Sequence, residues 1–257
     1  MATTTTPTPT PTSTATSTST LTPTSTAGTS ATAGAARPSL AVRVLGDTHA
    51  LGRRLPQLAF GLVLYGTSMG LMLRSGLGLD PWDVFHQGLQ RTIGLSVGAW
   101  VTIMGALVLL LWIPMRQRPG VGTVANVAVI GAAMDGALRL FDAPGGLPAR
   151  IALMVGAVLL NGLATGLYIG ARLGSGPRDG LMTGLHRRTG RSLRLVRTGI
   201  EVTVLLAGIL LGGTAGVGTV LYALAIGPLA QLFLPWCTVP GPAGIEGEPT
   251  VQTPRKG

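Results

Sequence analysis

Cysteine is almost absent from this chain, since Cys237 is the only one among 257 residues. An intramolecular disulfide is therefore excluded, and a thiolate metal cluster cannot be built from this chain alone. The sequence also lacks a phosphate-binding G-x-x-x-x-G-K-[ST] loop, an H-E-x-x-H helix and a hydrolase serine elbow. ATP hydrolysis and the known hydrolytic chemistries thus have no visible machinery. We predict no enzyme activity, no cofactor and no metal site.

Charge is also scarce, because Asp, Glu, Lys and Arg together make up only 11% of the chain. Nearly all of these residues lie outside long apolar runs, and the mean hydropathy is +0.49. A soluble core does not have this composition, so we predict an integral membrane protein whose first partner is the lipid bilayer. The net charge of +10 does not indicate nucleic-acid binding, because the arginines stand at the ends of apolar runs rather than on one surface.

The first 36 or so residues are almost entirely Thr, Pro, Ser, Ala and Gly. No basic segment followed by an apolar one occurs there, so this is not a secretory signal peptide. The composition is typical of disorder. We predict a disordered Thr/Pro-rich cytoplasmic tail over residues 1–54, a membrane domain over 55–236 and a short cytoplasmic tail over 237–257.

About twenty apolar residues are needed for a helix to cross the hydrocarbon core. Six runs meet this criterion, which predicts an all-α polytopic membrane bundle. With the N-terminus inside, fifteen Arg and Lys residues fall on the cytoplasmic side and four on the other, so both termini are expected in the cytoplasm. The predicted spans lie near residues 56–74, 96–115, 120–141, 149–171, 195–213 and 215–235.

The chain contains an internal repeat, because a shift of 96 positions maps Pro81 onto Pro177 and holds without a gap over a long stretch. The same shift pairs one Gly-Val-Gly-Thr segment, beginning at Gly120, with another beginning at Gly216. Each copy holds three spans, an odd number, so the copies must be inverted relative to one another. We predict inverted repeats over about 55–141 and 149–236. Such repeats recur in secondary transporters, which is an analogy of architecture.

Each copy carries a short G-x-x-P-x-D segment after its first span. Pro81 and Pro177 suit the first position of a helix, and Asp83 and Asp179 at the third position complement its positive dipole end. Asp80 then serves as the N-cap in the first copy. The helices that follow run about ten residues, too short to span. Two interpretations stay open, an amphipathic helix on the membrane surface or a re-entrant helix that lines a solute path.

Charges inside apolar runs are expensive and mark functional candidates, here Asp135 and Glu201. Each has an arginine four residues away, Arg139 or Arg197, so a structural ion pair is an equal alternative. The two intramembrane asparagines could line a path or bridge helices. His86 has no match in the other copy and is expected to be a solvated interface residue. The candidate solute or proton site comprises Asp135, Glu201, Asp83, Asp179, Asn126 and Asn161.

Two further features concern packing and the cytoplasmic face. The matched glycine pairs Gly66-x-x-x-Gly70 and Gly162-x-x-x-Gly166 allow close approach of helices, so we expect these two first spans to cross near the symmetry axis. A cluster of basic residues follows the second short helix and could hold an anionic lipid headgroup or enforce topology. This basic face comprises Arg187, Arg188, Arg191 and Arg194.

The segments Gly78-Leu79-Asp80-Pro81-Trp82-Asp83 and Gly174-Ser175-Gly176-Pro177-Arg178-Asp179, with the Gly-Val-Gly-Thr segments after them, resemble the YczE and YitT-like family of bacterial membrane proteins. The resemblance covers about Leu55 to Trp236 and implies a plasma-membrane location, but little mechanism. Two functions follow as hypotheses: a secondary transporter or exporter of a small solute with its site between the repeats, or a scaffold or regulator that docks a partner or anionic lipid. Homo-oligomerisation is left open.

Overall fold

The structure, a computed structural model, describes residues 40–239, with side chains from Leu51 onward, so most of both predicted tails lies outside the described residues. The described part contains helices and connecting loops without a strand, as the sequence predicts. The helices are α1 (Leu40–Ser75), α2 (Pro81–Ile93), α3 (Val97–Trp112), α4 (Val121–Leu140), α5 (Leu147–Gly170), α6 (Pro177–Thr189), α7 (Leu193–Leu210) and α8 (Val217–Cys237).

Four of these helices are long and apolar enough to cross a bilayer, namely α1 from Leu51, α4, α5 and α8. A fifth span results if α2 and α3, which bend by 113° at their junction, are counted as one. α3 has 16 residues, or about 24 Å at the helical rise, which is short of a hydrocarbon core of about 30 Å. The predicted count of six is therefore not reached on length and apolarity. α1 also begins at Leu40, earlier than the predicted start near residue 55.

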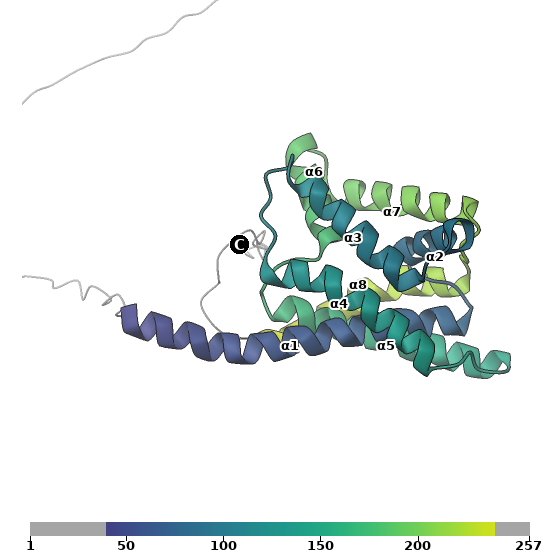
Figure 1. Ribbon diagram of the computed structural model, residues 1–257, viewed down its shortest axis with the longest axis horizontal. Coiled ribbons are helices and arrows are strands. Elements are labelled where there is room, and N and C mark those ends of the chain that lie inside the picture. Colours follow the sequence, from purple (N-terminus) through teal and green to yellow (C-terminus); the bar gives the residue numbers. More distant parts are fainter. Residues whose placement is uncertain (1–39, 240–257) are drawn as a thin grey trace, which may run out of the picture. The chain divides into compact units, whose positions relative to one another are not determined.

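α1 runs antiparallel to α5 and packs along it (Figure 1). At one end, Arg150 Nε donates to the Ser75 carbonyl at 2.7 Å. Toward the other end, Gln57 Nε2 donates to the Leu167 carbonyl at 2.9 Å. Because the start of α5 meets the end of α1, and the reverse holds near Gln57, the two helices have opposite directions. α4 packs on α1 and α8 packs on α5, so these four helices form the framework of the bundle.

The glycine pairs were expected to bring α1 and α5 together, but they face α4 and α8 instead. A Cβ placed on Gly66 would lie 2.8 Å from the Ala133 Cβ on α4. A Cβ on Gly162 would lie 2.6 Å from the Leu229 Cβ on α8. The glycines thus permit the parallel contacts α1 with α4 and α5 with α8, which are the matching contacts of the two repeats. α1 and α5 do pack on each other, through other residues.

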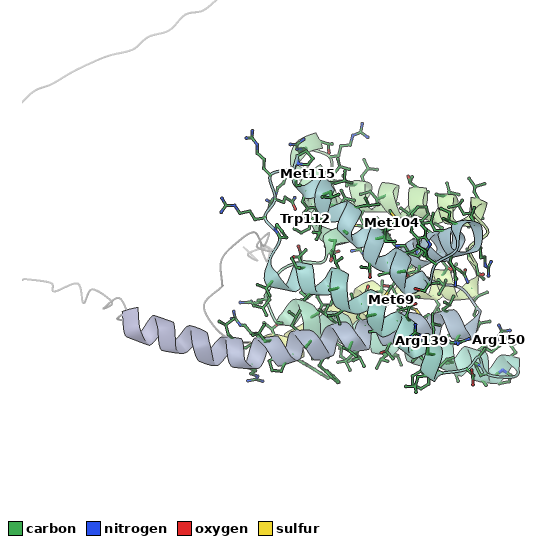
Figure 2. The ribbon with its side chains drawn as sticks, viewed as in Figure 1. Met69, Met104, Trp112, Met115, Arg139 and Arg150 are labelled. Carbon is green, nitrogen blue, oxygen red and sulfur yellow. The ribbon has the colours of Figure 1, made fainter. Side chains whose placement is uncertain are left out.

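Arginines gather at opposite ends of the helices. Figure 2 shows Arg139 and Arg150 beside the turn between α4 and α5, at the end opposite Met115. Arg74 donates to the Leu138 carbonyl at the first of these ends. At the other, Arg188 donates to the Pro114 carbonyl and ties the end of α6 to the end of α3. The guanidinium groups therefore satisfy carbonyls at helix ends that have no partner within their own helix.

Candidate functional site

The loops before α2 and α6 turn back into the protein at two equivalent glycines. Gly78 has φ +131° and Gly174 has φ +133°, values that only glycine adopts without strain. A Cβ on Gly78 would lie 2.7 Å from the Thr219 backbone nitrogen, and a Cβ on Gly174 would lie 2.7 Å from the Thr123 hydroxyl. Both the backbone conformation and the close approach therefore require glycine here, which explains the first letter of each G-x-x-P-x-D segment.

Each Gly-Val-Gly-Thr segment holds the loop of the other repeat. The Gly122 amide at the start of α4 donates to the Leu173 carbonyl at 2.8 Å, and the Gly218 amide at the start of α8 donates to the Leu77 carbonyl at 2.9 Å. The Thr219 hydroxyl also accepts the Leu79 amide at 3.1 Å. The two sequence motifs thus bind one another reciprocally. As a result the N-terminal ends of α2 and α6 are held inside the bundle and close together.

α2 starts as the sequence predicts and is then buried. Pro81 occupies the first turn, and the Asp80 carboxylate caps the helix by accepting the Trp82 and Asp83 amides at 2.9 and 3.2 Å. Trp82, Asp83 and His86 are all at most 6% exposed. A helix lying on the membrane surface would expose one face, so this helix is instead packed within the protein, with its start in the interior.

α6 is positioned by a tryptophan of α3. Trp112 Nε1 donates to the Pro177 carbonyl at 3.1 Å. The ring of Trp112 also packs against Gly180, where any side chain would collide with it. Gly176 is the N-cap and offers no side chain to the first turn. The start of α6 is therefore fixed by its neighbours rather than by its own cap.

A buried charge cluster forms where the two helix starts meet. Arg178 of α6 lies 3.5 Å from an Asp80 oxygen and 3.8 Å from an Asp83 oxygen, both carried by α2. The His86 Nδ1 lies 3.0 Å from Asp83 Oδ1. The guanidinium also stacks over the Trp82 ring at 5.0 Å from its centroid. Asp80 and Asp83 are 3% and 0% exposed, and both are paired with the same arginine.

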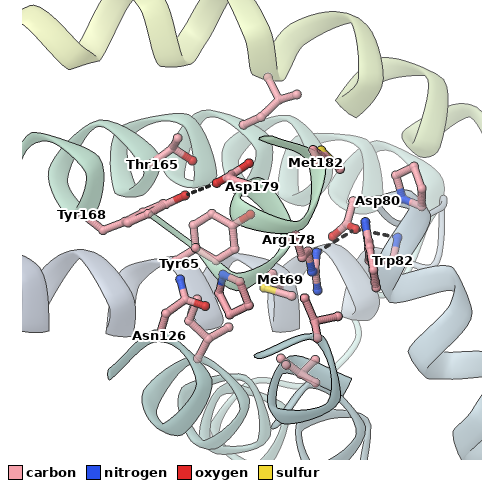
Figure 3. Close-up of a pocket in the computed structure, with 18 of the residues that line it drawn as sticks. Tyr65, Met69, Asp80, Trp82, Asn126, Thr165, Tyr168, Arg178, Asp179 and Met182 are labelled. Carbon is pink, nitrogen blue, oxygen red and sulfur yellow. Dashed lines mark hydrogen bonds and ion pairs between the residues drawn. The ribbon is translucent and has the colours of Figure 1, made fainter. Parts of the chain in front are cut away.

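This cluster forms one wall of a cavity of about 220 Å³ (Figure 3). Both repeats supply its lining, and all three tyrosines of the chain face it, namely Tyr65 of α1, Tyr168 of α5 and Tyr222 of α8. The Tyr168 hydroxyl donates to the Asp179 carboxylate at 3.2 Å. On the side of α7, Arg197 Nε donates to Glu201 at 2.9 Å. The cavity therefore combines aromatic rings with paired charges, and lies on the boundary between the two halves.

The residues chosen from the sequence fall into three positions. Asp179, Glu201, Asn126, Pro81 and Pro177 line the cavity, and Asp83 lies directly behind it against Arg178. The other two candidates lie elsewhere.

Asn161 is fully buried and bridges three helices. Its amide donates to the Ser68 hydroxyl at 2.8 Å and it accepts the Tyr222 hydroxyl at 3.2 Å. Asp135 lies outside the cavity lining. It accepts the Gly98 amide at 2.9 Å and the Ser96 hydroxyl, so it binds the start of α3 rather than Arg139, the partner in one of the two alternatives.

Sequence reasoning missed several members of the site. His86 is 1% exposed, so its predicted place as a solvated interface residue is wrong. Arg178 was not among the candidates chosen from the sequence, yet it lines the cavity. The spacing of Asp83 and His86, three residues apart on a helix, was the signal that could have paired them. Asp80 was recognised only as a cap. In the part of the chain that the structure describes, no group of three or more His, Cys, Asp or Glu side chains could hold a metal ion.

Residues 52–235 match the family of unknown function DUF6198. The chain belongs to this family. An uncharacterized protein of Haemophilus influenzae is 39% identical over 177 residues, covering 69% of this chain and 81% of that protein. The uncharacterized membrane protein YczE of Bacillus subtilis is 35% identical over 177 residues, covering 68% and 82%. YyaS of the same organism is 29% identical over 182 residues, covering 68% and 89%. No solved structure matches.

The match to YczE confirms the resemblance drawn from the G-x-x-P-x-D segments, and it supports a multi-pass membrane protein. The matched family range ends within the last helix and leaves out the Thr/Pro-rich segment. The cavity and both of its helix starts thus lie within the part shared with the family.

Proposed function

We propose that this protein is a secondary transporter of a small solute and that the cavity between the repeats is its binding site. The supporting observation is the meeting of two buried helix starts, with Asp80, Asp83 and Arg178, at a cavity inside an apolar bundle. Ionised groups cost several kcal/mol in a membrane, so a bundle retains them where they serve a solute or ion path. Transport rather than catalysis is the function we infer.

The paired contacts of the two halves favour an inverted repeat. Gly122 and Leu173 are matched by Gly218 and Leu77 at the same shift of 96 positions, and so are the φ angles of the two loop glycines. The antiparallel course of α1 and α5, which begin the two repeats, agrees with this relation. We propose that α3 and α7 complete six spans, with both termini in the cytoplasm of a bacterial cell. Midplane sites at the boundary of inverted repeats are typical of secondary transporters.

A flux assay tests the transport proposal directly. Purified protein in sealed vesicles should exchange at least one member of a broad panel of radiolabelled small metabolites, in steps that saturate with concentration. Glu201→Gln, which alters the cavity, should reduce that flux at least tenfold. Asp142→Asn removes an exposed acid in the turn between α4 and α5 and serves as the matched control. A panel that yields no exchange and no proton movement would lead us to abandon transport.

Membrane topology can be tested with single cysteines in a Cys237→Ala background. Gly145 lies in an exposed turn with open space around it, and Arg191 is exposed beyond α6. A membrane-impermeant maleimide added to intact cells should label Gly145→Cys and leave Arg191→Cys unlabelled until the cells are opened. Labelling of both from outside would contradict the inverted arrangement.

A second function, a scaffold or regulator, is favoured by one observation. Arg187, Arg188, Arg191 and Arg194 are all exposed at the end of α6 and the start of α7. They form a basic surface that could dock an anionic partner or lipid headgroup. Crosslinking in cells separates the two functions. A stable complex that disappears when Arg191 and Arg194 are changed to Gln, with flux unaffected, would support docking.

A further inference from the structure

The charged groups around the cavity do not balance. Asp80 and Asp83 share the single guanidinium of Arg178, at 3.5 and 3.8 Å. Glu201 is paired with Arg197 at 2.9 Å, whereas Asp179 is bound by the Tyr168 hydroxyl rather than by a cation. Four carboxylates therefore face two arginines. When all are ionised, the groups around the cavity carry a surplus of negative charge.

Two of these carboxylates also have oxygens without a hydrogen-bond partner. Oδ2 of Asp80 and Oδ2 of Asp83 are buried and accept no hydrogen bond, and the same holds for His86 Nε2. Asp80 and His86 both line the cavity. The two carboxyl groups are neighbours, because both lie within 3.8 Å of the same Arg178 guanidinium. A buried carboxylate oxygen without a donor is unfavourable, so this pair has an open position for a proton. The Asp80 side chain also lines the cavity, where there is room for a cation.

The rest of the lining also suits a cation better than an anion. Three tyrosine rings and the Trp82 ring face the cavity, and Trp82 already stacks with a guanidinium at 5.0 Å. Aromatic faces attract ammonium groups by their electron-rich surface. The groups that would bind an anion are engaged, since Arg178 and Arg197 are paired with acids and the first amides of α2 are bound by Asp80.

We propose that the transported solute is a small organic cation, a primary or quaternary ammonium compound, which competes with one proton for the Asp80–Asp83 pair. This inference rests on the proposed transport function and names its substrate class. The cavity of about 220 Å³ is smaller than the roughly 300–1,000 Å³ of pockets for drug-sized ligands, so the solute is small. On binding, the cation replaces the shared proton, which is released to the solvent, so the charge of the site stays constant.

Other titratable or charged groups face this pair from the surrounding helices, beyond His86 and Arg178. α3 and α4 contribute no titratable side chain to the described lining of the cavity. The remaining groups are Tyr65 of α1, Tyr168 of α5, Asp179 of α6, Arg197 and Glu201 of α7, and Tyr222 of α8. Both arginines are paired with acids, which leaves the Asp80–Asp83 pair as the place where a proton and a solute cation compete.

Binding to the full-length protein in uncharged maltoside micelles tests this inference by titration calorimetry. The probes are tetramethylammonium, choline and ethylammonium, with 3,3-dimethyl-1-butanol as the neutral isostere of choline and butyrate as the anion. At least one cation should bind, and the neutral and anionic compounds should bind at least tenfold more weakly. Binding should release about one proton. Below the pH at which the free site becomes protonated, the affinity for the cation should fall about tenfold for each unit by which the pH is lowered.

Asp80→Asn is the decisive variant, because Asn is an equally good N-cap and preserves the start of α2. It should weaken cation binding at least tenfold and remove the proton release. Asp135→Asn changes an acid that binds the start of α3 outside the cavity and should leave binding unchanged. If no cation binds, if the neutral isostere binds equally well, or if Asp80→Asn behaves like the wild type, the inference is overturned.

The failure of this inference can be told apart from the failure of transport. Cation binding in micelles without any flux in vesicles would retain the site and refute transport. Flux of an anion or a neutral solute, with no cation bound, would retain transport and refute the cationic substrate.

Discussion

The two repeats build the same framework but differ in how their third and fourth helices meet. In the first repeat α3 packs on α4, with Gly98 facing Gly131 and Gly105 beside Val127. In the second repeat α7 and α8 do not pack closely on one another in the described part of the chain. The counterpart of Gly131 is Gly227, which has open space where a Cβ would stand and lines the cavity. The cavity therefore extends to the side where α7 has not closed.

This difference has a basis in the sequence. The shift of 96 positions places Arg194 where α3 has Gly98, and Glu201 where α3 has Gly105. Two glycines that allow contact in one repeat are thus replaced by long charged side chains in the other. The open contact between α7 and α8 is therefore encoded in these side chains.

Disulfide trapping should give the largest contrast between the halves. The Cβ of Val127 lies 3.7 Å from a Cβ placed on Gly105, within the range for a disulfide. In a Cys237→Ala background, Gly105→Cys with Val127→Cys should crosslink almost completely under mild oxidation. The equivalent pair, Glu201→Cys with Ala223→Cys, should remain unlinked. Mobility on a denaturing gel before and after reduction is the measurement.

The same experiment has two outcomes that would overturn this contrast. Equal and rapid crosslinking of both pairs would contradict the asymmetry. Slow crosslinking of the α3–α4 pair would show that its close packing is absent in the membrane.

Alanine at the two matched glycines should separate the repeats by stability. Gly131→Ala forces a methyl group against the backbone of α3 at Gly98, so we expect a loss of about 3 kcal/mol, toward the upper end of overpacking effects. Gly227→Ala has room and should change stability by no more than about 0.5 kcal/mol. Thermal unfolding in the same detergent measures both. Similar unfolding temperatures for the two variants would mean that the α3–α4 contact does not stabilise the fold.

The two asparagines form a smaller contrast of the same kind. The shift pairs Asn161 with Tyr65 and Asn126 with Tyr222. Asn161→Ala leaves the buried Tyr222 hydroxyl without its acceptor, which should cost about 2 kcal/mol. Asn126→Ala opens the cavity and should cost less than about 0.5 kcal/mol. Chemical unfolding curves measure both losses. A larger loss of stability for Asn126→Ala would contradict the assignment of Asn161 as the asparagine that bridges helices.

Sequence reasoning predicted the helices and the repeat. Apolar runs and caps are local signals, and the repeat is visible when the sequence is compared with itself. The starts at Pro81 and Pro177 are where the residues predict, since proline at the first turn and aspartate at the third are local preferences. The site was reached only in part. Arg178 meets Asp80 through a loop that turns back into the bundle, and no periodicity encodes that contact across repeats.

The direction in which each glycine pair faces was also beyond the sequence. A small-residue stripe predicts close packing but does not say which helix approaches. The charge of Asp135 was readable as costly in a membrane, yet its partners at the start of α3 became visible only in three dimensions. Short-range patterns thus predicted the elements, and the contacts between elements decided which polar residues share the cavity.

Helix capping gives the smallest expected contrast and the most closely matched pair. Ser96 and Ser192 are equivalent N-caps of α3 and α7, and accept the Ala99 and Leu195 amides at 3.0 and 3.3 Å. Ser96 additionally donates to Asp135 of α4, which joins the two helices, whereas among the described residues Ser192 makes only its own cap. Ser96→Ala should therefore destabilise by about 1 kcal/mol and Ser192→Ala by about 0.5 kcal/mol. In an Asp135→Ala background the two losses should become equal within error, and a persistent difference would assign the asymmetry to the caps themselves rather than to the contact between α3 and α4.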